Sequence, residues 1–400
     1  MTISNKFDCP ALNFRYFCRQ TDKQYPMSSK RNTTMSIVKG LAIILMVLGH
    51  AEAPGQITTF IYLFHMPVFF MASGYFFSRK NVDEPWEFCR KRFNSLYIPF
   101  LKWSLFFLLI HNFLFTAGIL NEQYGNWSGG VTHPYTLHQF LQRLVSIVFA
   151  MGGYDEFLAG AFWFFRALLI SSIVFLILFK LLEKRNSWFN GWKVAAAIAI
   201  LAVAFAVFKI SNKLSVINVV QGGIRETWGI LFFACGVIYR HFEPRLRLRW
   251  WMAVLFFAFL CAGTHFAWAG MNLSPKLQDA LTLPLTGIAG FLMLHIIASA
   301  IDKHDNPVKR FLVYAGDMSV YVYIFHISAF KLVSLVKIWW YGLDFGQIGC
   351  HMVIHDHHGD LFWILYTIVG TAIPLAWICL YRKADNKFKR AEIEKTANKN

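Results

Sequence analysis

Long runs of apolar residues, separated by short polar segments, recur along most of the chain. Ten of these runs are long enough to cross the hydrocarbon core of a bilayer, which is about 30 Å thick. They lie at residues 36–52, 57–78, 94–118, 160–182, 191–209, 224–240, 249–269, 280–300, 311–336 and 361–381. An apolar helix satisfies its own backbone hydrogen bonds in lipid. The pattern therefore predicts an all-α integral membrane protein with about ten transmembrane helices.

One further segment, at 138–151, differs from these runs in both length and polarity. It has only 14 residues and carries Gln139, Gln142 and Arg143. A segment of this length is too short to span a bilayer, and mixed polarity suits a helix lying at the membrane surface. We expect an interfacial or re-entrant helix here.

The remaining segments define the domain organisation. Residues 1–35 are polar and basic and do not resemble a signal peptide, and residues 383–400 are again basic. The short loops between the apolar runs leave no room for a second domain of ordinary size. We therefore expect one transmembrane domain at 36–382, flanked by a polar tail at each end.

Composition and charge support this interpretation and add an orientation. Of the 400 residues, 56% are hydrophobic and only 15% are charged, whereas soluble domains carry about 25% charged residues. The net charge of +17 would suggest a nucleic-acid partner in a soluble protein. Here 30 of the 39 Lys and Arg residues lie in the two tails and in alternate loops, against six in the opposite loops. By the positive-inside rule both termini are cytoplasmic, and nucleic-acid binding is disfavoured. The prediction is a multi-pass protein of the cell inner (cytoplasmic) membrane.

Several common site types are disfavoured by the motifs. Seven cysteines are scattered without a C-x-x-C pair, which disfavours a disulfide framework or a thiolate zinc site. No Walker loop, G-x-G-x-x-G or G-x-S-x-G motif is present. His351 and His355 have the i,i+4 spacing of a metal-chelating pair, but no glutamate of an H-E-x-x-H motif accompanies them. A solvated loop at 351–360 and no metal are expected.

Ionisable residues within membrane spans are costly and so are candidates for function. Lys39 and His50 lie eleven positions apart in the first span, close to three helical turns, so both project from one face about 16 Å apart along the axis. Lys39 is at the cytoplasmic end and His50 lies toward the outer side. The structural alternative is that Lys39 extends to the headgroups and His50 bonds to a neighbouring carbonyl.

Three other residues, His65, Arg166 and His326, stand out for the same reason. His65 precedes Pro67 in the second span, where the alternative is a buried histidine bonded to the carbonyls that the proline frees. Arg166 opens a span from the outside and could pair with an acidic substrate or with nearby Asp155 or Glu156.

His326 lies mid-span, and it too has a purely structural alternative. Arg90 and Arg92 form a basic turn that either contacts anionic lipid or binds the phosphates of a soluble donor.

Together these residues resemble a known family. The basic residue, ten others and a histidine at Lys39–His50 resemble the signature of the acyltransferase 3 family of membrane proteins, which O-acylate sugars. FHMPVFFMASGYFF at 64–77 resembles the second helix of its sugar O-acetyltransferase branch. WFFR at 163–166 and GDMSVYVYIFH at 316–326 resemble two later stretches, in family order. The chain departs from the family in having Ser95 where a second Arg often follows Arg92, and in having Lys rather than Arg at 39.

The resemblance implies a fold of ten spans and an enzyme. It implies transfer of an acyl group, with acetyl expected, from cytoplasmic acyl-CoA to a sugar hydroxyl of a cell-surface or lipid-linked glycan. His50 would be the general base, because a neutral imidazole accepts a proton near pH 7. The remaining candidates divide into two groups. Lys39, Arg90 and Arg92 would bind the CoA phosphates, and His65, Arg166 and His326 would contact the oxyanion or the acceptor.

Two questions stay open at the level of sequence. A transporter or flippase for an anionic or lipid-linked sugar would use the same intramembrane Lys, His and Arg residues. It would not transfer an acyl label, and it would be expected to show paired broken helices, which the sequence does not suggest. The sequence also leaves both a monomer and a homo-oligomer open.

Overall fold

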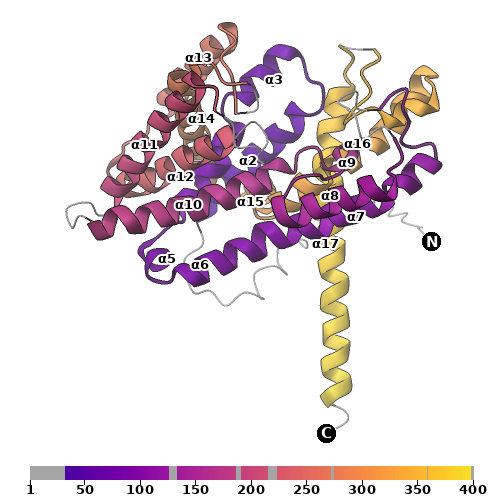
Figure 1. Cartoon of the computed structure of the whole chain (residues 1–400), viewed down its shortest axis with the longest axis horizontal. Helices are drawn as coiled ribbons and strands as arrows, with labels where there is room; N and C mark the ends of the chain where they lie inside the picture. The colour runs from indigo at the N-terminus through magenta and orange to yellow at the C-terminus, as the bar shows by residue number, and fades with distance from the viewer. Residues whose placement is uncertain are drawn as a thin grey trace, which may run out of the picture.

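The fold is a helical bundle, shown in Figure 1. The structure is a computed structural model that describes residues 32–125, 133–185, 191–214, 223–271, 274–357 and 359–397, and these residues contain no strand. Most of the predicted tail at 1–35 lies outside the described residues. The all-α class predicted from the apolar runs is confirmed for the part of the chain that the structure describes.

The helices follow one another with short connections. The α-helices are α2 (Thr33–Gly49), α3 (Gly55–Tyr62), α4 (His65–Tyr75), α5 (Arg79–Asp83), α6 (Pro85–Arg92), α7 (Ile98–Thr116), α8 (Leu137–Ala150), α9 (Glu156–Ala159), α10 (Trp163–Arg185), α11 (Trp192–Ser211), α12 (Ile224–Phe242), α13 (Trp250–His265), α14 (Asp279–Asp302), α15 (Pro307–Asp317), α16 (Ser319–Tyr341) and α17 (Phe362–Ala397). In the part of the chain that the structure describes, the short turns of other helix types are η1 (Phe93–Tyr97), η3 (Glu243–Arg245) and η4 (Phe345–Gly349).

Helices occur at all ten predicted runs, and seven are long and apolar enough to cross a membrane. Among the described residues, these seven candidate spans are Gly55–Tyr75 (α3 with α4), Pro85–Thr116 (α6, η1 and α7), Trp163–Glu183, Trp192–Ser211, Asp279–Asp302, Ser319–Tyr341 and Phe362–Asp385. The helices α2 and α13 are apolar but shorter, and α12 carries Arg225, Glu226 and Arg240 among its 19 residues. The structure thus supports a multi-pass membrane protein, and the figure of ten crossings stays a prediction.

The predicted run at 311–336 is divided into two helices. The helix α15 ends at Asp317, Met318 adopts φ −97° and ψ 12°, and α16 starts at Ser319. The break coincides with a contact to α2, because the Asp317 carboxylate accepts a hydrogen bond of 2.9 Å from the Ser36 hydroxyl. The membrane-length helix here is therefore Ser319–Tyr341, which starts eight residues later and ends five residues later than the predicted run.

Two other boundaries also differ from the sequence prediction. The segment 79–93 was expected to be a loop, but it forms the helices α5 and α6. The helical backbone then continues from α6 through the π-turn η1 into α7. The run at 57–78 is broken between α3 and α4, so that Pro67 lies in the first turn of α4, where a missing N–H is tolerated. The carbonyl of Leu63, four residues earlier, accepts a hydrogen bond from the Thr286 hydroxyl at 3.2 Å.

The helix expected at 138–151 is present as α8. Its N-terminus is closed by a capping box in which the Thr136 hydroxyl accepts from the Gln139 N–H and the Gln139 side chain accepts from the Thr136 N–H. The helix packs beside α7 (Figure 1). Its position at a membrane surface stays a prediction.

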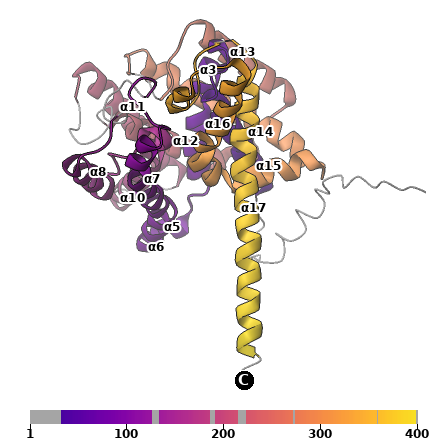
Figure 2. The same ribbon diagram turned by 90° about the vertical axis from the view of Figure 1, so that its right-hand side faces the viewer.

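The helix α2 lies at the centre of the bundle, surrounded by α3, α4, α14, α15, α16 and α17 (Figures 1 and 2). Ten of its seventeen residues are buried, including Ser36 and Gly40. A Cβ atom on Gly40 would lie 2.2 Å from the Leu312 carbonyl oxygen, and one on Gly316 would lie 1.8 Å from that of Ser36. Such contacts allow two backbones to approach closely, as small residues do in other membrane helices. The α2–α15 packing therefore requires glycine at both positions.

Polar bonds hold the start of α2 in place. The Thr33 and Thr34 hydroxyls donate to the Asp302 carboxylate at the end of α14, at 2.8 and 2.6 Å. Lys309 of α15 pairs with the same carboxylate at 2.7 Å. Because hydrogen bonds to a charged group are stronger than neutral ones, this cluster fixes the end of α2 relative to α14 and α15.

The helix α17 is much longer than the predicted run at 361–381. It continues through residues 383–397, which were expected to form a basic tail. Its C-terminal half projects beyond the other helices in both views (Figures 1 and 2).

We predict that Gly316→Ala destabilises the bundle. The added methyl group would overlap the Ser36 carbonyl, and overpacking of this kind costs about 1–3 kcal/mol. Thermal unfolding of the detergent-solubilised protein, followed by size-exclusion chromatography, would measure the change. Gly55→Ala is the matched control, because a Cβ atom there meets nothing within 4 Å. Equal melting temperatures for the two variants would show that the α2–α15 contact is not tight.

Candidate active site

His50 lies at the end of the central helix, one residue beyond Gly49. It is the C-cap residue of α2, and its backbone N–H donates to the Met46 and Val47 carbonyls. Its side chain is half-buried. The neighbouring Tyr62 of α3 donates its hydroxyl to the Gly49 carbonyl at 2.9 Å, and its ring lies edge-on to the His50 ring. The backbone that carries His50 is therefore held from two sides.

His326 of α16 faces His50 directly. The His50 Nδ1 and His326 Nε2 atoms are 2.9 Å apart, although the two residues are 276 positions apart in the sequence. The His326 ring is buried, and its Nδ1 atom lies 2.9 Å from the Tyr323 carbonyl and 3.2 Å from that of Val322. Of the predicted site residues, these two are brought into contact.

The hydrogen bonds assign a tautomer to each ring. Two carbonyl acceptors face the Nδ1 atom of His326, so this atom carries the proton and Nε2 keeps its lone pair. That lone pair can only accept, so His50 donates from Nδ1. The Nε2 atom of His50 is then left with a free lone pair, which is the form of imidazole that acts as a base.

His65 is close to this pair but bonds elsewhere. It is buried on α4, and its Nδ1 atom donates to the Ile61 carbonyl at 2.9 Å. The centroid of its ring lies 5.1 Å from that of the Tyr62 ring. Tyr62 therefore has two histidine neighbours, His50 and His65. The structural alternative for His65 thus holds in its burial and in its bond to a carbonyl, but the acceptor is Ile61 and not Leu63, the carbonyl that Pro67 frees, which accepts from Thr286.

His351 is a site residue that the sequence analysis missed. It belongs to the irregular segment 350–360, and it is near enough to His50 to interact with it electrostatically. Its ring packs against Gly160, and its Nδ1 atom is buried without a hydrogen-bond partner. Burial lowers the pKa of His351 to about 4, so the ring is neutral at neutral pH. The solvated loop predicted here is wrong for His351.

The same segment is tied to the residues that follow His50. His355 pairs with Glu52 at 2.6 Å, and this hydrogen bond raises the pKa of His355 above its ordinary value. Glu52 has φ 60°, which a non-glycine residue adopts only when its surroundings hold it there. Among the described residues, no group of three or more His, Cys, Asp or Glu side chains could hold a metal ion.

Arg166 has a partner that the sequence analysis did not foresee. Its Nε atom donates to Glu226 Oε1 of α12 at 3.1 Å, and both side chains are buried. The expected local partner Asp155 instead bonds to His111 and caps α9. The Arg166 Nη2 and Glu226 Oε2 atoms have no hydrogen-bond partner. The pair joins α10 to α12, and no described contact links Arg166 to His50.

Tyr323 connects the start of α10 to the histidine pair. Its hydroxyl donates to the Ala161 carbonyl, and its own carbonyl accepts from His326. The rings of Phe162 and Phe165 pack around it, 6.0 and 5.0 Å away between centroids. The W-F-F-R stretch is thereby placed beside α16.

The predicted donor-binding residues lie in other parts of the fold. Lys39 is half-buried on α2, eleven residues before His50. Arg90 is exposed on α6 and pairs with Glu87 at 2.8 Å. Arg92 lies over the rings of Phe88 and Phe233, 5.0 and 5.7 Å from their centroids. Arg90 and Arg92 thus lie on or near α6, and Lys39 shares a helix with His50.

Comparison with known proteins assigns the chain to a family. The model of the acyltransferase 3 family, described as an acyltransferase domain, matches residues 32–382. No curated protein and no solved structure gives a significant match. The matched region runs from the start of α2 into α17, and so it contains the histidine pair and the helices that hold it. The chain therefore belongs to the acyltransferase 3 family and is a multi-pass membrane acyltransferase.

Proposed function

We propose that this enzyme transfers an acetyl group from cytoplasmic acetyl-CoA to a sugar hydroxyl of a cell-surface or lipid-linked glycan. The observation that carries the proposal is the hydrogen bond between His50 and His326 at the end of the buried α2 helix. It leaves one imidazole nitrogen free to accept a proton in a largely buried setting. Family membership favours acyl transfer over the transporter or flippase alternative.

In this proposal His50 Nε2 is the general base. It takes the proton of the sugar hydroxyl while the hydroxyl oxygen attacks the thioester carbonyl. The tetrahedral intermediate expels CoA as a thiolate, which takes the proton back from His50 to leave the thiol. The imidazolium formed in between keeps its Nδ1–H bond to His326, which holds the ring in one orientation. His326 is thus a positioning residue.

Lys39 is the proposed anchor for the CoA phosphates. It lies in the proposed cytoplasmic half of α2, on the face that bears His50. The separation of about 16 Å along the helix is of the order of the pantetheine arm's reach. Arg90 and Arg92 would add positive charge near the bound phosphates on the cytoplasmic side. Each would then contact the donor in addition to its present partner, which is Glu87 for Arg90 and the rings of Phe88 and Phe233 for Arg92.

His65 and Arg166 have supporting roles in the proposal. His65 positions Tyr62, which holds the Gly49 carbonyl next to His50. Arg166 would contact the acceptor through its unpartnered Nη2 atom, on the side of the bundle where the W-F-F-R stretch begins. The excess of Lys and Arg residues in the two tails and in alternate loops supports cytoplasmic termini in the inner membrane. The acceptor would then arrive from outside.

We predict that His50→Ala abolishes acetyl transfer. Loss of a general base costs about 10²–10⁴-fold in rate. His326→Gln should lose less than His326→Ala, because the Gln side-chain oxygen can still accept from His50 Nδ1. Transfer of radiolabelled acetyl from acetyl-CoA to envelope glycan, in membranes containing each variant, measures both effects.

His265→Ala is the control for the histidine variants, because His265 is exposed at the end of α13. Full activity in a correctly folded His50→Ala protein would remove His50 from the mechanism. If the unaltered protein transfers no label, the proposal fails in its choice of acetyl as the acyl group or of envelope glycan as the acceptor.

We predict that Lys39→Ala raises the KM for acetyl-CoA about tenfold, with kcat changed less than threefold. Removing one charge that contacts phosphate costs on the order of 1.4 kcal/mol, which corresponds to a tenfold change. Lys39→Arg should retain most of the affinity, and the effect should shrink at high salt because screening weakens the contact. Lys303→Ala, an exposed lysine of another loop on the proposed cytoplasmic side, is the control. A large loss of kcat at unchanged KM would contradict the anchor role.

A further inference from the structure

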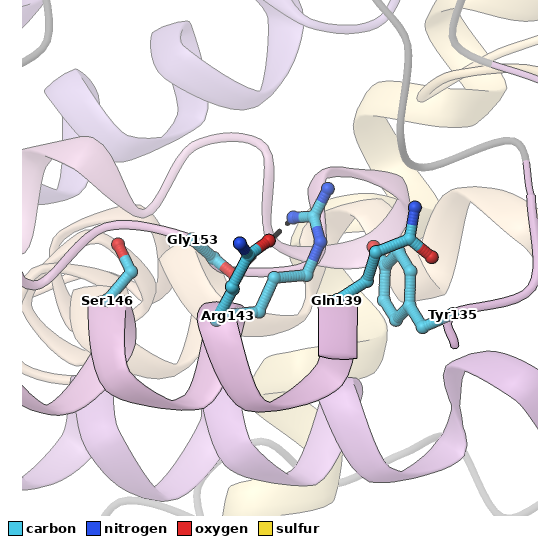
Figure 3. A pocket seen from close by; sticks show the side chains of 6 residues that line it. Tyr135, Gln139, Arg143, Ser146 and Gly153 are labelled. Carbon is cyan, nitrogen blue, oxygen red and sulfur yellow. Dashed lines mark hydrogen bonds between the residues drawn. The ribbon is translucent and has the colours of Figure 1, made fainter. Parts of the chain in front are cut away.

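A polar pocket lies between α8 and the loop that follows it, away from the histidine pair. Its volume is about 400 Å³. It is lined by Tyr135, Gln139, Gln142, Arg143, Ser146 and Gly153. Figure 3 shows the Gln139, Arg143 and Ser146 side chains projecting from one face of α8 toward Gly153, with Tyr135 at one end.

The helix α8 presents three different sides. Ile147 is buried, and Phe140 and Leu144 pack toward the core of the bundle. A second side is apolar and exposed, as the exposed fractions of Leu141 (47%) and Val145 (55%) show. The third side carries the polar residues of the pocket. This arrangement suits a helix at a membrane surface, with lipid on one side and a polar ligand on another.

The chemistry of the lining matches sugar hydroxyl groups. Two amides, a hydroxyl, a guanidinium and a phenol supply both donors and acceptors, and no carboxylate lines the pocket. The Arg143 guanidinium lies 4.5 Å from the centroid of the Tyr135 ring. Tyr135 is only 6% exposed, and its hydroxyl has no hydrogen-bond partner. A buried hydroxyl without a partner costs free energy.

The other polar contacts in the pocket leave donors available. Gln139 uses its side-chain oxygen in the capping box, so its amide N–H groups are not used there. Gln142 donates to the exposed His138. Arg143 reaches the Gly153 and Tyr154 carbonyls at 3.5 and 3.4 Å through Nη1 alone.

A short segment joins this pocket to the histidine pair. Gly153 lines the pocket, while Gly160 contacts the His351 ring and Ala161 accepts from the Tyr323 hydroxyl. The nine residues from Gly153 to Ala161 are joined by eight steps and span at most about 28 Å when extended. They include the helix α9, so the real distance is shorter. The backbone thus connects the pocket to the contacts around the histidine pair over a short stretch of chain.

We propose that this pocket binds a sugar unit of the acceptor glycan remote from the hydroxyl that is acetylated. The inference rests on the proposed function and extends it to an oligomeric or polymeric acceptor. Binding of a remote part of the substrate would raise the affinity for the glycan without taking part in the chemistry. The lining has a single cation, which does not suit the several phosphates of CoA, and its polarity does not suit an acyl chain.

The test compares two acceptors with the full-length enzyme in membranes. One is the envelope glycan of the producing cells, treated with mild base to remove esters, and the other is the monosaccharide mixture from its acid hydrolysis. The variants are Gln142→Trp, which fills the pocket from an exposed position, and Arg143→Gln. The control is Leu141→Ala on the apolar exposed side of the same helix.

With the polymeric glycan, both pocket variants should raise the acceptor KM at least fivefold and change kcat less than twofold. With the monosaccharides, both parameters should match those of the unaltered enzyme, and Leu141→Ala should change neither acceptor's values. An unchanged KM for the polymer, or an equal loss with both acceptors, would overturn the proposal. Absence of transfer by the unaltered enzyme to either acceptor would overturn the proposed function itself, which is a different result.

Discussion

The burial of α2 at the centre of the bundle is the constraint on which the rest of the structure depends. A helix surrounded by six others needs room, and Gly40 and Gly316 provide it by letting the α2 and α15 backbones touch. The Asp302 cluster fixes the start of the helix, and the Tyr62 hydroxyl fixes its end. A residue at the end of such a helix is held within narrow limits, which catalysis requires of a general base.

The placement of α2 also determines the protonation pattern of the site. His50 can donate to His326 only because α16 lies against α2 at that level, and His326 can accept only because its other nitrogen is occupied by carbonyls. A change that moved α2 by about an ångström would break the His50–His326 hydrogen bond, and His50 would no longer be held in one tautomer. The packing of glycines far from the site therefore bears directly on the chemistry proposed at His50.

Much of the fold could be predicted from sequence, but its contacts could not. Apolar runs located a helix at every expected place, since the formation of an apolar helix is a local property of the chain. The pairing of His50 with His326 joins segments 276 residues apart, and that of Arg166 with Glu226 joins segments 60 apart. The neighbouring acids Asp155 and Glu156 suggested a different partner for Arg166. The helix break at Met318 and the burial of His351 likewise depend on tertiary packing.

The central claim is that the acyl donor meets its acceptor at His50 Nε2. The most direct measurement is an experimental structure of the protein in lipid with a non-hydrolysable thioether analogue of acetyl-CoA. The account predicts that the CoA phosphates lie at Lys39. It also predicts that the acyl carbonyl carbon faces His50 Nε2 across a gap of about 4 Å, which leaves room for an attacking hydroxyl. An acyl group bound away from both histidines would contradict the account.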